Sequence, residues 1–230
     1  MDLFGFEIKR KEKPLGEKSF VAPSDDGAVE SIRAGGYYGT YMDLEGIAQT
    51  EAELIKRYRD IALMADVDTA VEDIINESVA QLENESPVEI NLDEVQLSAS
   101  VRKRMSAEFD EIKNILDFKD RAQDYFRRWY VDGRMYYHKV IDRESPRKGI
   151  TELRYIDPRK MRKVREIKKS RDLKGKGIEV VEQTAEWFVY NERGIQAGND
   201  NAGVKIAADS ITFVTSGVVD QTRNMVMGHL

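Results

Sequence analysis

An aspartate and a nearby glutamate-lysine pair have the types and spacing of a metal-dependent nuclease site. Asp157 ends one probable strand, and Glu166 and Lys168 lie on the next. Two carboxylates on neighbouring strands can hold Mg²⁺, and a lysine can steady the hydroxide that attacks a phosphodiester. The pattern has low specificity, because Glu-x-Lys also occurs at Glu7 and Glu111 and because an Asp-Pro pair is typical of a turn. Nuclease chemistry therefore stands as an alternative function only.

Other residues that carry chemistry are scarce. The sequence has two histidines, His138 and His229, and no cysteine, so neither a zinc site of His and Cys nor a disulfide framework is expected. It contains no Gly-x-Ser-x-Gly turn and no Gly-x4-Gly-Lys-Ser/Thr phosphate loop. We therefore expect no enzyme, no catalytic or metal-binding residue, no cofactor and no small-molecule substrate.

A basic run between two expected strands could contact DNA phosphates or a partner protein. Such contacts would be independent of sequence and sensitive to salt. No aromatic residue interleaves the run to stack on bases, which favours a flexible, solvated hairpin tip over contact with phosphates. The basic residues of this exposed loop are Lys168, Lys169, Arg171, Lys174 and Lys176.

The charge of the chain is unevenly distributed. The net charge is -6, which argues against a general nucleic-acid binder. Residues 43–97 hold 15 acidic and three basic residues, whereas residues 154–176 hold 11 basic and three acidic residues. These segments are either two solvated faces of opposite sign, or surfaces that meet partners of the opposite charge.

Hydrophobic periodicity predicts helices first and strands afterwards. Residues 50–53 have the spacing of a capping box that would begin a first helix, and Tyr125, Phe126 and Trp129 follow one face of a later one. An Asp-Gly turn at Gly133 then leads into strands of period two. A strand is also expected at residues 88–92. The expected fold class is α+β, with N-terminal helices followed by a mostly antiparallel set of short strands.

The same reading divides the chain into three parts. Residues 1–44 are expected to form an irregular arm, because glycine and proline interrupt every pattern there. Residues 45–218 are expected to form one α+β domain, helical over 45–132 and rich in strands over 133–218. Residues 219–230 are expected to begin a helix that the end of the sequence truncates.

Several segments, in order, resemble the portal proteins of large contractile-tailed bacteriophages. None of them is diagnostic alone, but their shared order and spacing are fairly specific. Residues 129–142 and 149–158 resemble the wing region of these proteins. The other matching segments are residues 57–60 with 66–77, 130–134, 155–160 and 208–211.

The resemblance implies a structural protein of the virion, assembled in the host bacterial cytoplasm. Family members form a ring-shaped homo-oligomer, typically a homododecamer, at one vertex of the capsid. Double-stranded DNA is packaged and ejected through the ring without sequence specificity, and terminase and the neck and tail proteins attach to it. Family members are much longer than this chain. The resemblance thus implies a fragment comprising the N-terminal wing, with the channel-lining stem and the terminase-binding clip beyond Leu230.

Two other classes of function remain open at this stage. A free-standing nucleic-acid-binding or metal-dependent nuclease module would bring Asp157, Glu166 and Lys168 into one site. A generic α+β scaffold protein would not form a ring.

Overall fold

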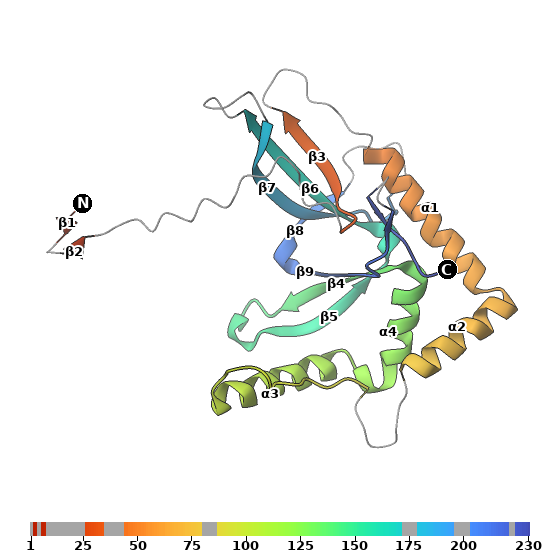
Figure 1. Cartoon of the computed structure of the whole chain (residues 1–230), viewed down its shortest axis with the longest axis horizontal. Coiled ribbons are helices and arrows are strands. Elements are labelled where there is room, and N and C mark those ends of the chain that lie inside the picture. The colour runs from red at the N-terminus through yellow and green to blue at the C-terminus, as the bar shows by residue number, and fades with distance from the viewer. Residues whose placement is uncertain are drawn as a thin grey trace.

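The computed structural model shows an α+β fold in which helices precede mostly antiparallel strands (Figure 1). The described residues are 2–3, 6–7, 26–34, 44–79, 87–171, 179–195, 203–220 and 224–230. Across these ranges, none of the helices is both long and apolar enough to cross a membrane. The fold class predicted from the sequence is confirmed.

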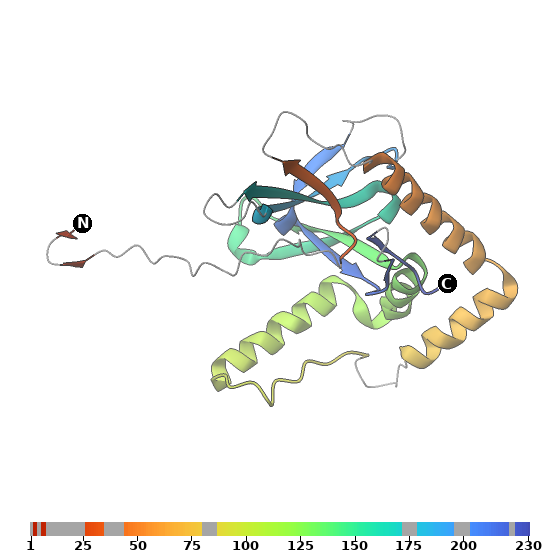
Figure 2. The same cartoon turned by 45° about the horizontal axis from the view of Figure 1, so that its top comes forward.

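Four helices flank the strands in the described part of the chain (Figure 1). They are α1 (Leu44–Ala62), α2 (Ala65–Ser78), α3 (Ala99–Ile115) and α4 (Phe118–Asp132). Helices α1 and α2 meet at a corner formed by Leu63 and Met64, and α3 lies at the far side of the molecule from this corner (Figures 1 and 2). The Ser98 side chain caps α3 by accepting a hydrogen bond from the Val101 N–H.

Helix α4 ends at the predicted Asp-Gly turn. Gly133 has φ of +70°, and its N–H donates to the Trp129 carbonyl, as in a glycine-terminated helix. A Cβ on Gly133 would lie 2.2 Å from the Met227 carbonyl oxygen, so no larger residue fits. The chain then enters a strand directly, which fixes the angle between α4 and the sheet.

A three-stranded antiparallel sheet follows, in the order β5-β4-β9. Its strands are β4 (Arg134–Ile141), β5 (Ile150–Ile156) and β9 (Ile211–Thr215). The Trp129 indole N–H donates to the Thr215 carbonyl at 2.9 Å, which ties α4 to the edge of this sheet.

A second sheet has four strands in the order β3-β6-β7-β8. They are β3 (Val29–Ala34), β6 (Met161–Arg171), β7 (Glu179–Tyr190) and β8 (Val204–Ala207). Strand β3 pairs in parallel with β6, whereas β6-β7 and β7-β8 are antiparallel. Two short antiparallel pairs complete the elements: β1 (Asp2–Leu3) with β2 (Phe6–Glu7), and β10 (Val219–Asp220) with β11 (Met225–Val226).

Aromatic residues join the two larger sheets. Tyr136 of β4 stacks on Phe213 of β9 with ring centroids 4.7 Å apart, and it meets Phe188 of β7 edge-on at 5.9 Å. Met161 and Ile211 complete this buried cluster. Such packing removes both inner sheet faces from water, which is the dominant stabilising contribution.

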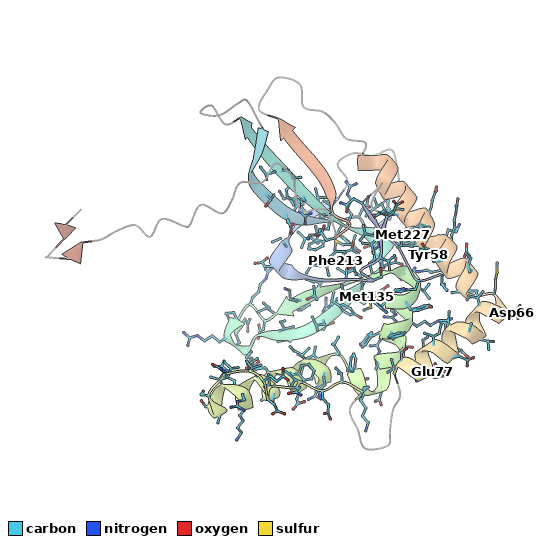
Figure 3. All side chains as sticks on the ribbon, viewed as in Figure 1. Tyr58, Asp66, Glu77, Met135, Phe213 and Met227 are labelled. Atoms are coloured by element: carbon cyan, nitrogen blue, oxygen red, sulfur yellow. The ribbon has the colours of Figure 1, made fainter. Side chains whose placement is uncertain are left out.

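A second cluster holds the helices to the C-terminal segment. Tyr58 and Ala62 of α1 pack with Val131 of α4, and Met227 and Leu230 lie against them. Figure 3 shows Tyr58 and Met227 close together beside α1. Gly228 runs so near the backbone that a Cβ there would lie 2.3 Å from the Val131 carbonyl oxygen.

The structure corrects three of the predicted elements. Helix α1 begins at Leu44 rather than at residue 50, so Thr50 lies inside the helix and Glu51 is buried. The described segment 88–92 has no paired strand. Within the arm of residues 1–44, β3 is a regular strand, although most of that arm lies outside the described residues.

The expected helix at residues 219–230 is also wrong. The described residues form the β10-β11 pair, and residues 227–230 continue without helix. The physical reason is tertiary: Asn224 adopts φ of +47°, and Arg134 donates to the Val226 carbonyl. A local helical pattern gives way when buried side chains bind the backbone in another conformation.

Candidate functional site

The residues proposed for nuclease chemistry do not form one site. Asp157 follows β5 of the three-stranded sheet, whereas Glu166 and Lys168 lie on β6 of the other sheet. Glu166 comes five residues after the start of β6, which corresponds to about 16 Å of extended strand. No group of three or more metal-binding side chains occurs within the ranges that the structure describes.

Asp157 instead belongs to an ion cluster that joins helices to sheet. The Arg59 guanidinium donates to both oxygens of Asp132, at 2.8 and 2.7 Å, and to Asp157 at 3.1 Å. Arg159 donates to the same Asp157 carboxylate at 2.8 Å. One arginine of α1 thereby binds the last residue of α4 and the turn between β5 and β6.

The environment keeps this cluster ionised. Burial works to raise the pKa of Asp157, but hydrogen bonds from Arg159 and Arg59 outweigh it and hold that pKa well below its usual range. The hydrogen bonds to Asp132 raise the pKa of Arg59 in turn. The Asp132 side chain is only 3% exposed, so it depends on Arg59 for compensation of its charge.

A second ion pair lies deeper, between α1 and β4. Arg134 donates to Glu51 at 2.8 Å, with the two side chains 3% and 8% exposed. Arg134 also donates to the Val226 carbonyl. Burial opposes the charge of Arg134, but the attraction of Glu51 outweighs this, and the pKa of Arg134 is raised.

Arg59 brings together three of the segments that carry the family resemblance. Arg59, Asp132 and Asp157 come from residues 57–60, 130–134 and 155–160, and they meet in one cluster. The sequence showed Asp132 only as a turn residue. Its one sequence signal is a charged residue on each side of the glycine that ends an amphipathic helix.

A pocket of about 380 Å³ opens beside the cluster. It lies between α1, α4 and the end of β5, and Arg59, Leu63 and Tyr155 are among its lining residues. Arg127, at its side, pairs with Asp68 of α2, and Arg128 lies over the Tyr155 ring at 4.6 Å. Arg127 and Arg128 therefore each contact a residue of another element.

Many basic residues of segment 154–176 are likewise paired within the chain. Lys163 and Arg165 both reach Asp26 and Glu186, at 2.5 to 3.0 Å. Three further ion pairs are Arg154 with Glu152, Arg159 with Asp157, and Lys160 with Glu192. This internal pairing reduces the positive surface expected from the sequence.

The basic loop is only partly described. Strand β6 extends to Arg171 in its pairing with β7. Its C-terminal end therefore contains Lys168, Lys169 and Arg171, which were expected in a loop. Lys174 and Lys176 lie outside the described residues. A role for these five residues in binding DNA or a partner stays a prediction.

The two histidines lie on different elements. His138 is exposed on β4. The His229 ring lies 4.8 Å from that of Trp129 and 5.0 Å from that of Tyr130. The backbone N–H of His229 donates to the Tyr130 carbonyl. His229 thus holds the C-terminal segment against α4.

Part of the acidic segment 43–97 forms an exposed negative surface on α2. Asp66, Glu72, Asp73 and Glu77 are exposed, and the last turn of this helix has no basic residue. Figure 3 shows Asp66 and Glu77 at the outer edge of the molecule. This edge is a strongly negative surface.

Known proteins with similar sequences are bacteriophage portal proteins. One, from Vibrio phage KVP40, is 33% identical over 174 residues, which cover 73% of this chain and 33% of that protein. Another, from Salmonella phage ViI, is 31% identical over 186 residues, covering 80% of this chain and 33% of that protein. The chain therefore spans about a third of the length of these relatives.

The family described as Bacteriophage T4-like portal protein (Gp20) matches residues 51–230. This match covers most of the chain, including the Arg59 cluster, the Arg134–Glu51 pair and all strands of both larger sheets except β3. The chain belongs to the T4-like portal protein family.

Proposed function

We propose that this chain is part of a structural subunit of the portal ring of a phage capsid. The ring is a homo-oligomer of twelve subunits. Double-stranded DNA is packaged and ejected through it. Terminase and the neck, tail and capsid proteins attach to it. The observation that carries this proposal is membership of the T4-like portal family over residues 51–230.

The internal geometry supports a role as a rigid platform. Arg59 and Arg134 each bind partners on other elements, so the helices and sheets are held in one arrangement. Buried ion pairs of this kind contribute more to a unique orientation than to net stability. A subunit that must match identical neighbours around a ring needs such a fixed shape.

The charge also suits a conduit for DNA. The net charge of -6 and the acidic surface of α2 repel phosphate, and several basic side chains on β5 and β6 are bound internally. A conduit must let its cargo move, and a strongly basic lining would hold it. The alternative, a nucleic-acid-binding or nuclease module, loses support because Asp157 and Glu166 lie on different sheets.

The test is to purify the full-length protein and image it by electron microscopy. The proposal expects closed rings with a central channel, with a subunit number that native mass spectrometry checks against twelve. The same preparation is incubated with linear double-stranded DNA and Mg²⁺. Persistent monomers would contradict the proposal, and Mg²⁺-dependent cleavage that Asp157→Ala abolishes would favour the nuclease.

A further inference from the structure

Helix α3 presents an apolar stripe that its own neighbours do not bury. Val101, Met105, Phe109, Ile112 and Leu116 recur at helical spacing and fall on one face. Of these, Val101, Met105 and Ile112 are 43%, 38% and 43% exposed, and α3 has no buried residue along its 17 residues. An amphipathic helix gains most of its stability by burying its apolar face, so this stripe is suited to a partner.

The N-terminal end of α3 is basic. Arg102, Lys103 and Arg104 follow one another within its first two turns, which contain no acidic residue. The α3 surface therefore combines an exposed apolar stripe with a positive edge.

The corner between α1 and α2 has the complementary character. Leu63 and Met64 are 79% and 59% exposed at its tip, and Ile61 is 38% exposed beside them. The acidic residues of α2 begin immediately afterwards, at Asp66. This corner combines a protruding apolar tip with a negative edge.

We infer that the α1-α2 corner of one copy of this chain docks on the α3 face of the next copy. The two surfaces lie at opposite sides of the molecule in both views (Figures 1 and 2). One copy cannot join them within itself, whereas contact between different patches on successive copies is head-to-tail and generates a ring when the rotation closes. The inference rests on the proposed ring and names the surfaces that build it.

Charge complementarity favours a second copy over other occupants. Apolar tip meets apolar stripe, while the acidic residues of α2 come beside the basic residues of α3 and fix the orientation. Helix α3 is about 25 Å long, so its face can supply a contact of the extent found in specific interfaces.

Engineered disulfides test the contact directly, because these 230 residues contain no cysteine. Leu63→Cys and Met105→Cys are introduced together into the full-length protein, which is then oxidised and run on a denaturing gel. The inference expects a ladder of covalent multimers that extends beyond the dimer. The matched control pairs Leu63→Cys with Val204→Cys, at an exposed valine of β8 outside both surfaces, and expects no ladder.

Charge reversal gives a second readout that does not depend on oxidation. Lys103→Glu on α3 is expected to raise the protein concentration needed for assembly roughly tenfold, because like charges would then face each other. Glu72→Lys in the same chain is expected to restore assembly. Arg147→Glu, an exposed reversal in the turn between β4 and β5, is the control and leaves assembly unchanged.

The outcomes separate this inference from the proposed function. Rings by electron microscopy without a ladder would overturn the inference and leave the portal function standing, since another segment or protein would then cover α3. Dimers from Leu63→Cys alone would overturn it in favour of a symmetric contact. Failure of the unmodified protein to form rings would overturn both.

Discussion

Arg59 of α1 and Asp132, the last residue of α4, form a bidentate ion pair with nitrogen-oxygen distances of 2.8 and 2.7 Å. Asp132 is adjacent to Gly133, and Gly133 is adjacent to Arg134, which binds Glu51 nearer the N-terminus of the same α1. Three consecutive residues therefore hold one helix, end another and begin a sheet. The orientation of helices and strands depends on this junction.

Replacing Asp132 with alanine should destabilise the protein by about 2–3 kcal/mol. Removal of one partner of a buried ion pair weakens the compensation of the other charge, and the effect is modest because Arg59 is 30% exposed and keeps its ion pair with Asp157. Urea unfolding measures the change. Arg104→Ala is the control: its pair with Glu108 is largely exposed, and we expect a change below about 0.5 kcal/mol. Equal effects of the two substitutions would contradict the structural role of the cluster.

Arg134 and Glu51 should show strong coupling in a double-mutant cycle. Arg134→Met alone leaves the Glu51 carboxylate buried without its cation and should cost about 3–5 kcal/mol. Adding Glu51→Leu removes that carboxylate and should recover much of the loss. Additive effects of the two substitutions would show that the pair does not form.

Gly133 and Gly149 provide a matched comparison of backbone and contact effects. Both have positive φ, +70° and +81°, so alanine costs at least about 1 kcal/mol at either from backbone strain alone. The backbone cost is larger at Gly149, about 1–3 kcal/mol, because its ψ of −147° is a conformation found almost only for glycine. At Gly133 the new Cβ would also lie 2.2 Å from the Met227 carbonyl oxygen, whereas at Gly149 nothing lies within 4 Å. Gly133→Ala should therefore abolish stable folding, judged by thermal unfolding, while Gly149→Ala should remain folded. A folded Gly133→Ala variant with an unchanged melting temperature would refute the close approach of residue 227.

Stability should fall in acid partly through Asp157. Its pKa in the folded state lies below the ordinary value of 3.8, so the carboxylate contributes stability that is complete above about pH 4–5. That contribution is lost as the pH falls through the ordinary value toward the folded one. The urea midpoint measured from pH 6 to pH 2 should thus decrease, and Asp157→Asn should show a shallower decrease because it no longer titrates. An identical slope in the variant would assign the acid sensitivity to other groups, such as Asp26 and Glu186, whose pKa values are also lowered.

Local patterns predicted the elements best where sequence alone determines the backbone. The aromatic period of α4, the Asp132-Gly133 turn and the alternation along β4 gave a helix, a turn and a strand that the structure confirms. Each depends on residues a few positions apart. The order of helices and strands, and so the α+β class, followed from the same signals.

Long-range pairing was not predictable in this way. Strand β3 pairs with β6, more than 130 residues later, and no turn signal links two strands so far apart. The C-terminal residues looked helical by themselves, but Arg134 binds the Val226 carbonyl and His229 stacks on Tyr130. The ion cluster was missed for the same reason, since Arg59, Asp132 and Asp157 become neighbours only after folding.

The parallel pairing of β3 with β6 has a mechanical consequence. A pull on the chain ahead of Asp26 acts along the axis of β3, so the hydrogen bonds from Val29 to Ala34 are loaded together in shear instead of opening one after another. The ion pairs that Asp26 forms with Lys163 and Arg165 resist sliding in the same direction. The N-terminal strand is thereby anchored against tension, where an antiparallel hairpin pulled from its open end would peel.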